Sequence, residues 1–140
     1  MSQKRIIGRR EIVSILDLEL FDLDAKVDTG ADSNSLHCDD IYIDDENFVH
    51  FTLLDKVHPA YHSKKIKMPL HKLKRVKSSN GTVQLRASIK IDMLFFGKKY
   101  RTVVSLTNRS DMKYPMLIGR KFLANRFLVD VSQEYLTKAI

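Results

Sequence analysis

The residues best suited to chemistry stand together in the run Lys26-Val27-Asp28-Thr29-Gly30-Ala31-Asp32-Ser33, directly after an apolar segment. An aspartate that ends a strand and enters a glycine turn presents its carboxylate at a fixed position. Such a carboxylate can act as a general base on a water molecule. The triplet Asp28-Thr29-Gly30 is short, so two interpretations stay open: a catalytic aspartate, or a turn in which the aspartate side chain bonds the following backbone.

A second stretch, Tyr114 to Leu123, reads as an apolar strand, then Gly119-Arg120, then the start of a short helix. The order of these two signatures resembles that of the retropepsin-like aspartic proteases. The longer segments 26–31, 35–37, 75–81 and 112–120 are similar to one bacterial branch of that family, which is often labelled "ATP-dependent zinc protease". The resemblance spans roughly residues 9 to 131.

The resemblance implies a role for each matching residue. Asp28 matches the catalytic aspartate. Thr29 matches the threonine whose hydroxyl bonds the opposite loop and keeps two carboxylates coplanar, and Gly30 matches the glycine whose carbonyl faces substrate. Asp32 and Arg120 match an ion pair beneath the site, expected to be buried and therefore costly to break from one side.

The resemblance also implies a flap, a hairpin that closes over substrate and excludes water. The dipeptide Asn80-Gly81 favours a two-residue hairpin turn between segments 73–78 and 82–92. An ordinary exposed turn is the alternative, since this hairpin has less glycine than viral flaps. The residues expected to contact substrate are Gly30, Ala31, Ser78, Ser79, Asn80 and Gly81.

Hydrolysis by this chemistry needs two carboxylates that share one water and one proton. The chain carries one Asp-Thr-Gly and is too short for a second similar lobe. The second Asp28 must therefore come from another copy across a two-fold axis. We expect a homodimer, with the strand at 127–131 at the position of the retropepsin dimer strand and residues 132–140 extending beyond it.

The label of this branch names zinc and ATP, and each would need a binding motif in the sequence. The sequence has neither a His-Glu-x-x-His motif nor a phosphate-binding loop. The run His37-Cys38-Asp39-Asp40 offers ligand types without distant partners, and Pro59 argues against a helix that would bring His58 and His62 together. We expect no metal and no cofactor, and we interpret Cys38 as a small, partly buried residue.

The net charge of +7 is concentrated between residues 64 and 77. Such a stretch could attract an acidic peptide or nucleic acid, although a solvated strand edge protected by lysine is the simpler interpretation. No nucleic-acid motif accompanies it, so nucleic acid is not the expected partner. The sequence has no secretory leader pattern and no membrane-length apolar run, which predicts a cytoplasmic protein.

Short β-rich segments with turn signals between them predict the elements that position these residues. Strands are expected at 6–16 (broken near Gly8), 21–27, 33–36, 41–43, 47–54, 64–68, 73–78, 82–92, 100–106, 114–118 and 127–131, with a short helix at 121–125. Residues 39–40 should end one strand. The predicted fold is all-β, a single retropepsin-like closed barrel over residues 1–140 with one short C-terminal helix.

Two functions are compatible with these residues. The first is an aspartic endopeptidase that hydrolyses peptide bonds in a peptide or protein substrate, for which the basic stretch suggests an acidic one. The second is a peptide-binding or regulatory module of the same fold with weak or no hydrolysis, because a complete Asp-Thr-Gly is necessary for catalysis but not sufficient.

Overall fold

The barrel is built from strands whose side chains alternate between an apolar core and solvent. The clearest case is β8 (Val83–Phe95), whose residues are buried at every second position from Ala87 to Phe95. This period of two is what a strand half-buried against a core produces. The computed structural model describes residues 3–77, 80–108 and 113–139.

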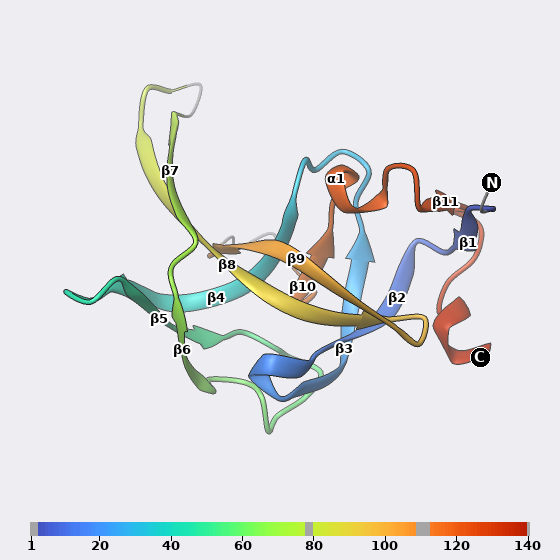
Figure 1. Cartoon of the computed structure of the whole chain (residues 1–140), viewed down its shortest axis with the longest axis horizontal. Helices are drawn as coiled ribbons and strands as arrows, with labels where there is room; N and C mark the ends of the chain where they lie inside the picture. Colours follow the sequence, from blue (N-terminus) through green and yellow to red (C-terminus); the bar gives the residue numbers. More distant parts are fainter. Residues whose placement is uncertain (1–2, 78–79, 109–112, 140) are drawn as a thin grey trace.

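Within those residues, six strands pair in a closed ring (Figure 1). Their order is β10 (Met116–Ile118), β3 (Leu20–Val27), β2 (Arg10–Ile15), β8, β9 (Lys98–Thr107) and β4 (Asn34–Ile43). The ring closes because β10 pairs with β3 in parallel and with β4 antiparallel. The predicted all-β closed barrel is confirmed.

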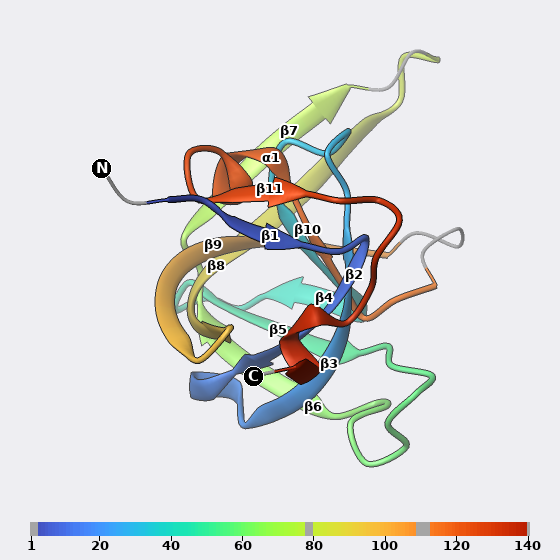
Figure 2. The same ribbon diagram turned by 90° about the vertical axis from the view of Figure 1, so that its right-hand side faces the viewer.

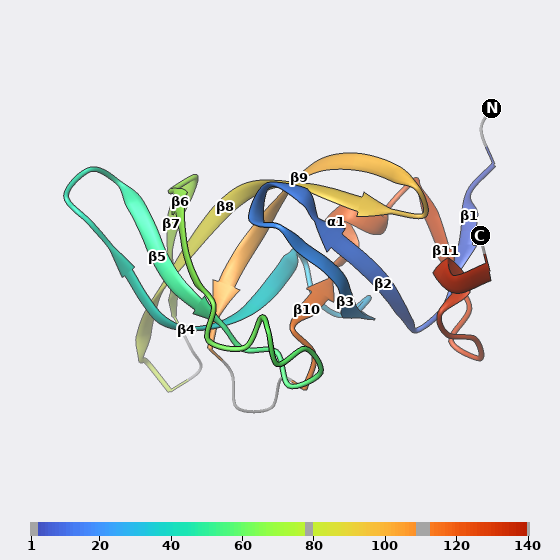
Figure 3. The ribbon, with the colours of Figure 1, turned by 90° about the horizontal axis from the view of Figure 1, so that it is seen from below.

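The remaining elements attach to this barrel. Two strands, β5 (Phe48–Leu53) and β6 (Lys65–Pro69), extend the sheet from β4, and Figure 3 shows the β4–β5 hairpin reaching beyond the barrel. A separate two-stranded parallel sheet joins β1 (Arg5–Ile7) to β11 (Phe127–Val129) (Figure 2). The α-helix is α1 (Arg120–Leu123), close to its predicted position, and two 3-10 turns, η1 (Leu16–Leu18) and η2 (Leu136–Ala139), were not predicted.

The strand predicted to end at residues 39–40 instead continues as β4 through Ile43. A register shift lies between Asp39 and Tyr42, and Asp40 adopts a positive φ of 52°. A β-bulge of this kind bends a strand without ending it. The acidic pair therefore marks an irregularity in a continuous strand, and β4 pairs with β5 beyond it.

The predicted flap is a hairpin of β7 (Lys72–Lys77) and the first part of β8, and it projects from the barrel in Figure 1. The predicted two-residue turn is wrong, because Lys77 pairs with Val83. A two-residue turn at Asn80-Gly81 would have placed Gln84 opposite Lys77. The observed register differs by one residue, which changes which side chains share a face.

The C-terminal segment after β11 packs against the start of β2. The buried carboxylate of Glu11 accepts hydrogen bonds from the Gly8 backbone N–H (2.7 Å) and from the Thr137 N–H and hydroxyl (2.9 Å each). These bonds satisfy the fully buried carboxyl oxygens and tie the two ends of the chain together. In the part of the chain that the structure describes, no helix has the length and apolarity needed to cross a bilayer.

Candidate active site

Asp28 lies where β3 leaves the barrel beside the end of β10. The two strands run parallel, with Val27 opposite Ile118, and the Asp28 N–H donates to the Ile118 carbonyl (2.9 Å). The half-buried carboxylate accepts a hydrogen bond from the Gly30 N–H at Oδ1 (3.0 Å). This is the local bond expected of an aspartate turn, and it fixes the carboxylate for chemistry as well.

The backbone at Gly119 lies close against Ser33 in the loop after Asp28 and holds that loop in place. A Cβ on Gly119 would lie 2.6 Å from both C and O of Ser33 and 2.8 Å from its N, so only glycine fits. The Gly119 N–H donates to Oδ1 of the buried Asn34 (3.0 Å), whose Nδ2 donates to the Thr102 hydroxyl (3.2 Å). Asn34 was not singled out from the sequence, because only its packing shows that it joins three strands.

Arg120 ties the helix start to the same loop. Its side chain forms an ion pair with Asp32 and donates to the carbonyls of Thr29 (3.2 Å) and Gly30 (3.3 Å). Its backbone N–H donates to the Ala31 carbonyl (2.8 Å). The expected pair is therefore formed, but in the single chain it is exposed rather than buried, with 54% of the Arg120 side chain and 69% of the Asp32 side chain accessible.

The residues expected to contact substrate are spread over two places. Gly30 and Ala31 lie in the loop after Asp28, exposed and half-exposed respectively, and Asn80 and Gly81 are exposed at the end of the flap hairpin. Ser78 and Ser79 lie outside the described residues. Their contact with substrate remains a prediction.

Between the loop and the flap lies a groove of about 740 Å³ that sequence reasoning missed. It is bordered by the loop residues 31–35, by the base of the flap, by β9 and by α1. Its cationic side chains are Lys72, Lys74, Arg86, Arg101, Lys121 and Arg126. Only the first two belong to the basic stretch noted in the sequence, because the others come together through strand pairing.

The basic stretch itself is not one surface. Lys72 and Lys74 line the groove, whereas the alternate residues Arg75 and Lys77 lie on the other face of the hairpin. Lys64 donates to the Leu18 carbonyl (3.0 Å) on another side of the barrel. A stretch that reads as one patch in the sequence is thus divided among several surfaces.

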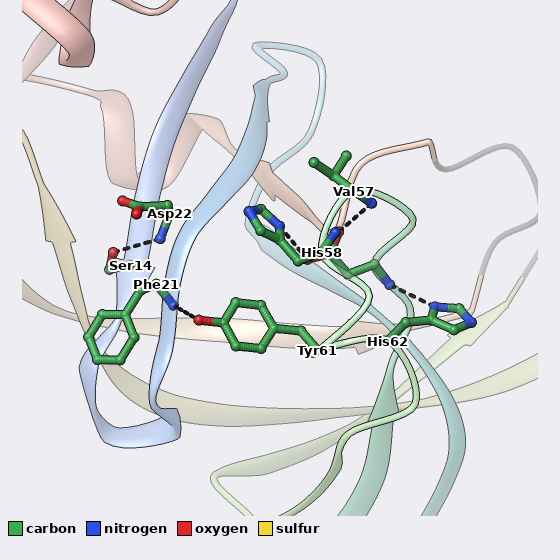
Figure 4. A network of polar contacts seen from close by, with 8 residues as sticks. Ser14, Phe21, Asp22, Val57, His58, Tyr61 and His62 are labelled. Carbon is green, nitrogen blue, oxygen red and sulfur yellow. Dashed lines mark hydrogen bonds and ion pairs between the residues drawn. The ribbon is translucent and has the colours of Figure 1, made fainter.

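The histidines considered as metal ligands hold the loop after β5 (Figure 4). The buried Asp55 accepts hydrogen bonds from the backbone N–H groups of Val57 (3.0 Å) and His58 (3.2 Å), and its Oδ2 lies 2.9 Å from His58 Nδ1. The Asp55 N–H donates to His62 Nδ1 (3.2 Å), and the Tyr61 hydroxyl accepts from the Phe21 N–H (3.1 Å). These contacts give the side chains a structural role.

Other candidate ligands are similarly placed. His37 and Cys38 are buried in β4, and burial raises the pKa of the Cys38 thiol well above its ordinary value. Across residues 3–77, 80–108 and 113–139, no three His, Cys, Asp or Glu side chains converge in a way that could hold a metal ion.

Comparison with known proteins places this geometry in context. A family model described as "Retropepsin-like aspartic endopeptidase RimB" matches residues 6–139. A crystal structure of a Legionella pneumophila protein of unknown function superposes with a TM-score of 0.74 at 27% identity, covering 96% of this chain and 99% of that one.

Curated relatives are longer proteins. A protein from Shewanella halifaxensis named "Probable alpha-L-glutamate ligase" is 33% identical over 139 residues, which cover 94% of this chain and 30% of that protein. A protein of the same name from Parasynechococcus marenigrum is 30% identical over 137 residues, covering 93% of this chain and 28% of the relative. The chain thus spans less than a third of the length of these two relatives.

Proposed function

Since the chain belongs to the RimB-like family of retropepsin-like aspartic endopeptidases, we propose that it is a peptidase assembled from two copies, each contributing one Asp28. The observation that carries the proposal is the position of this carboxylate. It stands at a strand end fixed by the Ile118 carbonyl and the Gly30 N–H, in a loop clamped by Gly119 and Arg120. One such loop per chain supplies half of a catalytic pair.

The chemistry of the pair follows from its charge. Two carboxylates about 3 Å apart share one proton, because both cannot ionise at that distance. The ionised Asp28 removes a proton from water, whose oxygen attacks the scissile carbonyl, while the protonated Asp28 donates a hydrogen bond to the carbonyl oxygen. Collapse of the tetrahedral intermediate breaks the C–N bond, and the amine leaves with the proton taken from water.

The supporting residues have proposed roles in this dimer. Thr29 bonds the partner's loop and keeps the two carboxylates coplanar, and the Gly30 carbonyl accepts a hydrogen bond from the substrate backbone. The exposed pair of Asp32 and Arg120 becomes buried only when a second copy or a substrate covers it. An ion pair that is exposed on one chain contributes little to stability by itself, so its value lies in positioning the loop.

One edge of the molecule suits the dimer contact. The flap, the loop after Asp28 and the β1–β11 sheet all lie in the upper part of Figure 1. On that sheet Ile6 and Leu128 pair in register, and each is 52% exposed. Covering these side chains with a second copy removes apolar surface from water, which favours association.

Acidic, glutamate-rich chains are the substrates that we propose. Relatives named "Probable alpha-L-glutamate ligase" contain a segment similar to this chain, and the glutamate in that name supports a glutamate-containing chain as the substrate class. The groove beside the Asp28 loop adds a positive surface that attracts carboxylates.

The test compares the wild type with Asp28→Asn. We expect the wild type to sediment as a dimer and to cleave a poly-α-L-glutamate peptide at acidic to neutral pH, and the variant to remain folded and lose cleavage. Asp45→Asn, which changes an exposed turn carboxylate far from the loop, serves as the control and should retain activity.

Mixing gives a sharper criterion. If each site needs two Asp28 carboxylates, random exchange of equal amounts of wild type and Asp28→Asn leaves roughly a quarter of the wild-type activity per dimer, whereas independent sites leave roughly half. A chain that binds peptide but cleaves none at any pH would overturn the peptidase and favour the binding module.

A further inference from the structure

The groove between the flap base and the Asp28 loop carries positive charge that the protein itself does not neutralise. Arg101 is paired with Asp17 (3.0 Å) and Asp92 (3.4 Å), and Arg126 donates to the Phe122 carbonyl (2.9 Å). In the described chain, Lys72, Lys74, Arg86 and Lys121 have no carboxylate within ion-pair distance. The one acidic side chain of the lining, Asp32, is already paired with Arg120.

Two of these cations stand directly opposite each other. Lys74 on β7 pairs with Arg86 on β8 in the antiparallel register, so both side chains point from the same face of the hairpin. Like charges at directly opposed positions of a sheet destabilise it. Lys72, two residues along on the same face, adds to this repulsion.

Arg86 has a second unusual feature. Its Nε is buried and has no hydrogen-bond partner in the described residues. A buried donor without an acceptor destabilises the folded state, because it has lost water and gained nothing. Arg86 also lines the groove, so its charged side chain is available to an acceptor from outside the chain.

We propose that Lys74 and Arg86 form a carboxylate-binding subsite that fixes an acidic side chain of the substrate at the base of the flap. This inference rests on the proposed peptidase and names the residues that determine its specificity. A carboxylate can accept two parallel bonds from a guanidinium, and its charge cancels the repulsion between the two cations. Binding of an acidic chain therefore stabilises the flap hairpin that covers it.

The surroundings favour a peptide carboxylate over a nucleic-acid phosphate. Phe122 is the one aromatic side chain in the described groove lining, apart from the imidazole of His71, and it is buried. Single-stranded nucleic acids are bound on several exposed aromatic rings, which this lining does not offer. Burial, Lys90 and Lys72 together lower the pKa of His71, so a neutral imidazole is favoured there.

The test measures binding without cleavage. In the Asp28→Asn background, calorimetric titration with a short poly-α-L-glutamate peptide is compared with a poly-glutamine peptide of equal length. We expect Arg86→Gln to weaken binding of the glutamate peptide roughly ten- to a hundredfold and Lys74→Gln to weaken it severalfold. The affinity for the poly-glutamine peptide should not change in either variant. Arg86→Lys keeps the positive charge but loses the paired N–H donors of the guanidinium. Its affinity for the glutamate peptide should lie between those of the wild type and Arg86→Gln.

The matched control is Arg75→Gln. It removes the same charge from the same hairpin on the opposite face, where Arg75 pairs with Leu85, and should change the affinity less than about twofold. Because the subsite is repulsive when empty, Lys74→Gln and Arg86→Gln should also raise the melting temperature of the free protein slightly. A residue that served only the fold would lower it.

The outcomes separate the two proposals. Equal losses for Arg75→Gln and Arg86→Gln would overturn the subsite, as would binding of a thymidine oligomer with the same dependence on Arg86. If only the Lys74 and Arg86 variants lose affinity for the glutamate peptide, and the wild type cleaves no peptide, the result would support the subsite and overturn the peptidase. If Lys74→Gln and Arg86→Gln, each with Asp28 intact, cleave the glutamate peptide at the wild-type rate, the result would support the peptidase and overturn the subsite.

Discussion

Replacing Gly119 with alanine tests the contact that positions the loop carrying Asp28. The new Cβ would lie 2.6 Å from C and O of Ser33, whereas ordinary van der Waals contact begins at about 3.4 Å. The two backbones must then separate by about 0.8 Å, and neither gives way easily, since Asn34 beside them is buried and hydrogen-bonded to Gly119. Overpacking of this kind costs about 1–3 kcal/mol.

For a chain of this size, that loss lowers the melting temperature by roughly 3–10 °C. Moving the loop that carries Asp28 should also reduce kcat by roughly ten- to a hundredfold at a temperature where the variant is folded. Calorimetry measures the first effect, and peptide cleavage per folded dimer measures the second.

The control must lose similar stability away from the loop. Val49→Ala removes two methyl groups from a fully buried position on β5, at a cost of about 2 kcal/mol. It should lower the melting temperature as Gly119→Ala does and keep kcat near the wild-type value. A Gly119→Ala variant with unchanged melting temperature and activity would refute the close approach.

Three further results are expected. The Cys38 thiol, buried and raised in pKa, should resist alkylation in the native protein and react on unfolding in urea. Asp44 has its pKa lowered to about 2, first by its hydrogen bond to His50. The stabilising contribution of the Asp44 carboxylate should therefore be complete above about pH 4 and be lost as the pH falls toward 2. The difference in unfolding free energy between wild type and Asp44→Asn should shrink over that interval. A difference that does not change with pH would contradict this expectation. Glu11→Ala leaves the Gly8 N–H and the Thr137 donors without their acceptor and should cost about 1–3 kcal/mol per orphaned buried donor in urea denaturation, with faster hydrogen exchange in residues 132–139.

Local sequence was enough to predict most strands and the closed barrel. Alternation of buried residues in β8 is a property of neighbouring residues. The strand break near Gly8 was also correct, since β1 ends at Ile7 and β2 begins at Arg10. The chain passes close to Gln133 here, and a Cβ on Gly8 would lie 2.5 Å from the Gln133 carbonyl oxygen. The strand end expected at residues 39–40 was wrong, because pairing with β5 and β9 keeps β4 continuous through a bulge.

The sequence by itself supplied the residue types of the candidate site. The aspartate, the glycine turn and the arginine after Gly119 lie in two short runs whose resemblance to the retropepsin-like family implies their roles, and one aspartate per chain predicts a partner copy. Local residue types fix a turn and a strand end without help from distant parts of the chain.

Only the tertiary structure decided what surrounds that chemistry. The register of the flap, one residue away from that of a two-residue turn, places Lys74 opposite Arg86, whereas the predicted turn would have placed Ala87 there. The groove likewise draws its cations from β7, β8, β9, α1 and the segment that follows it, which are far apart in the sequence. Strand register and long-range pairing depend on how the whole barrel closes, so no local pattern could show that positive charge gathers beside Asp28.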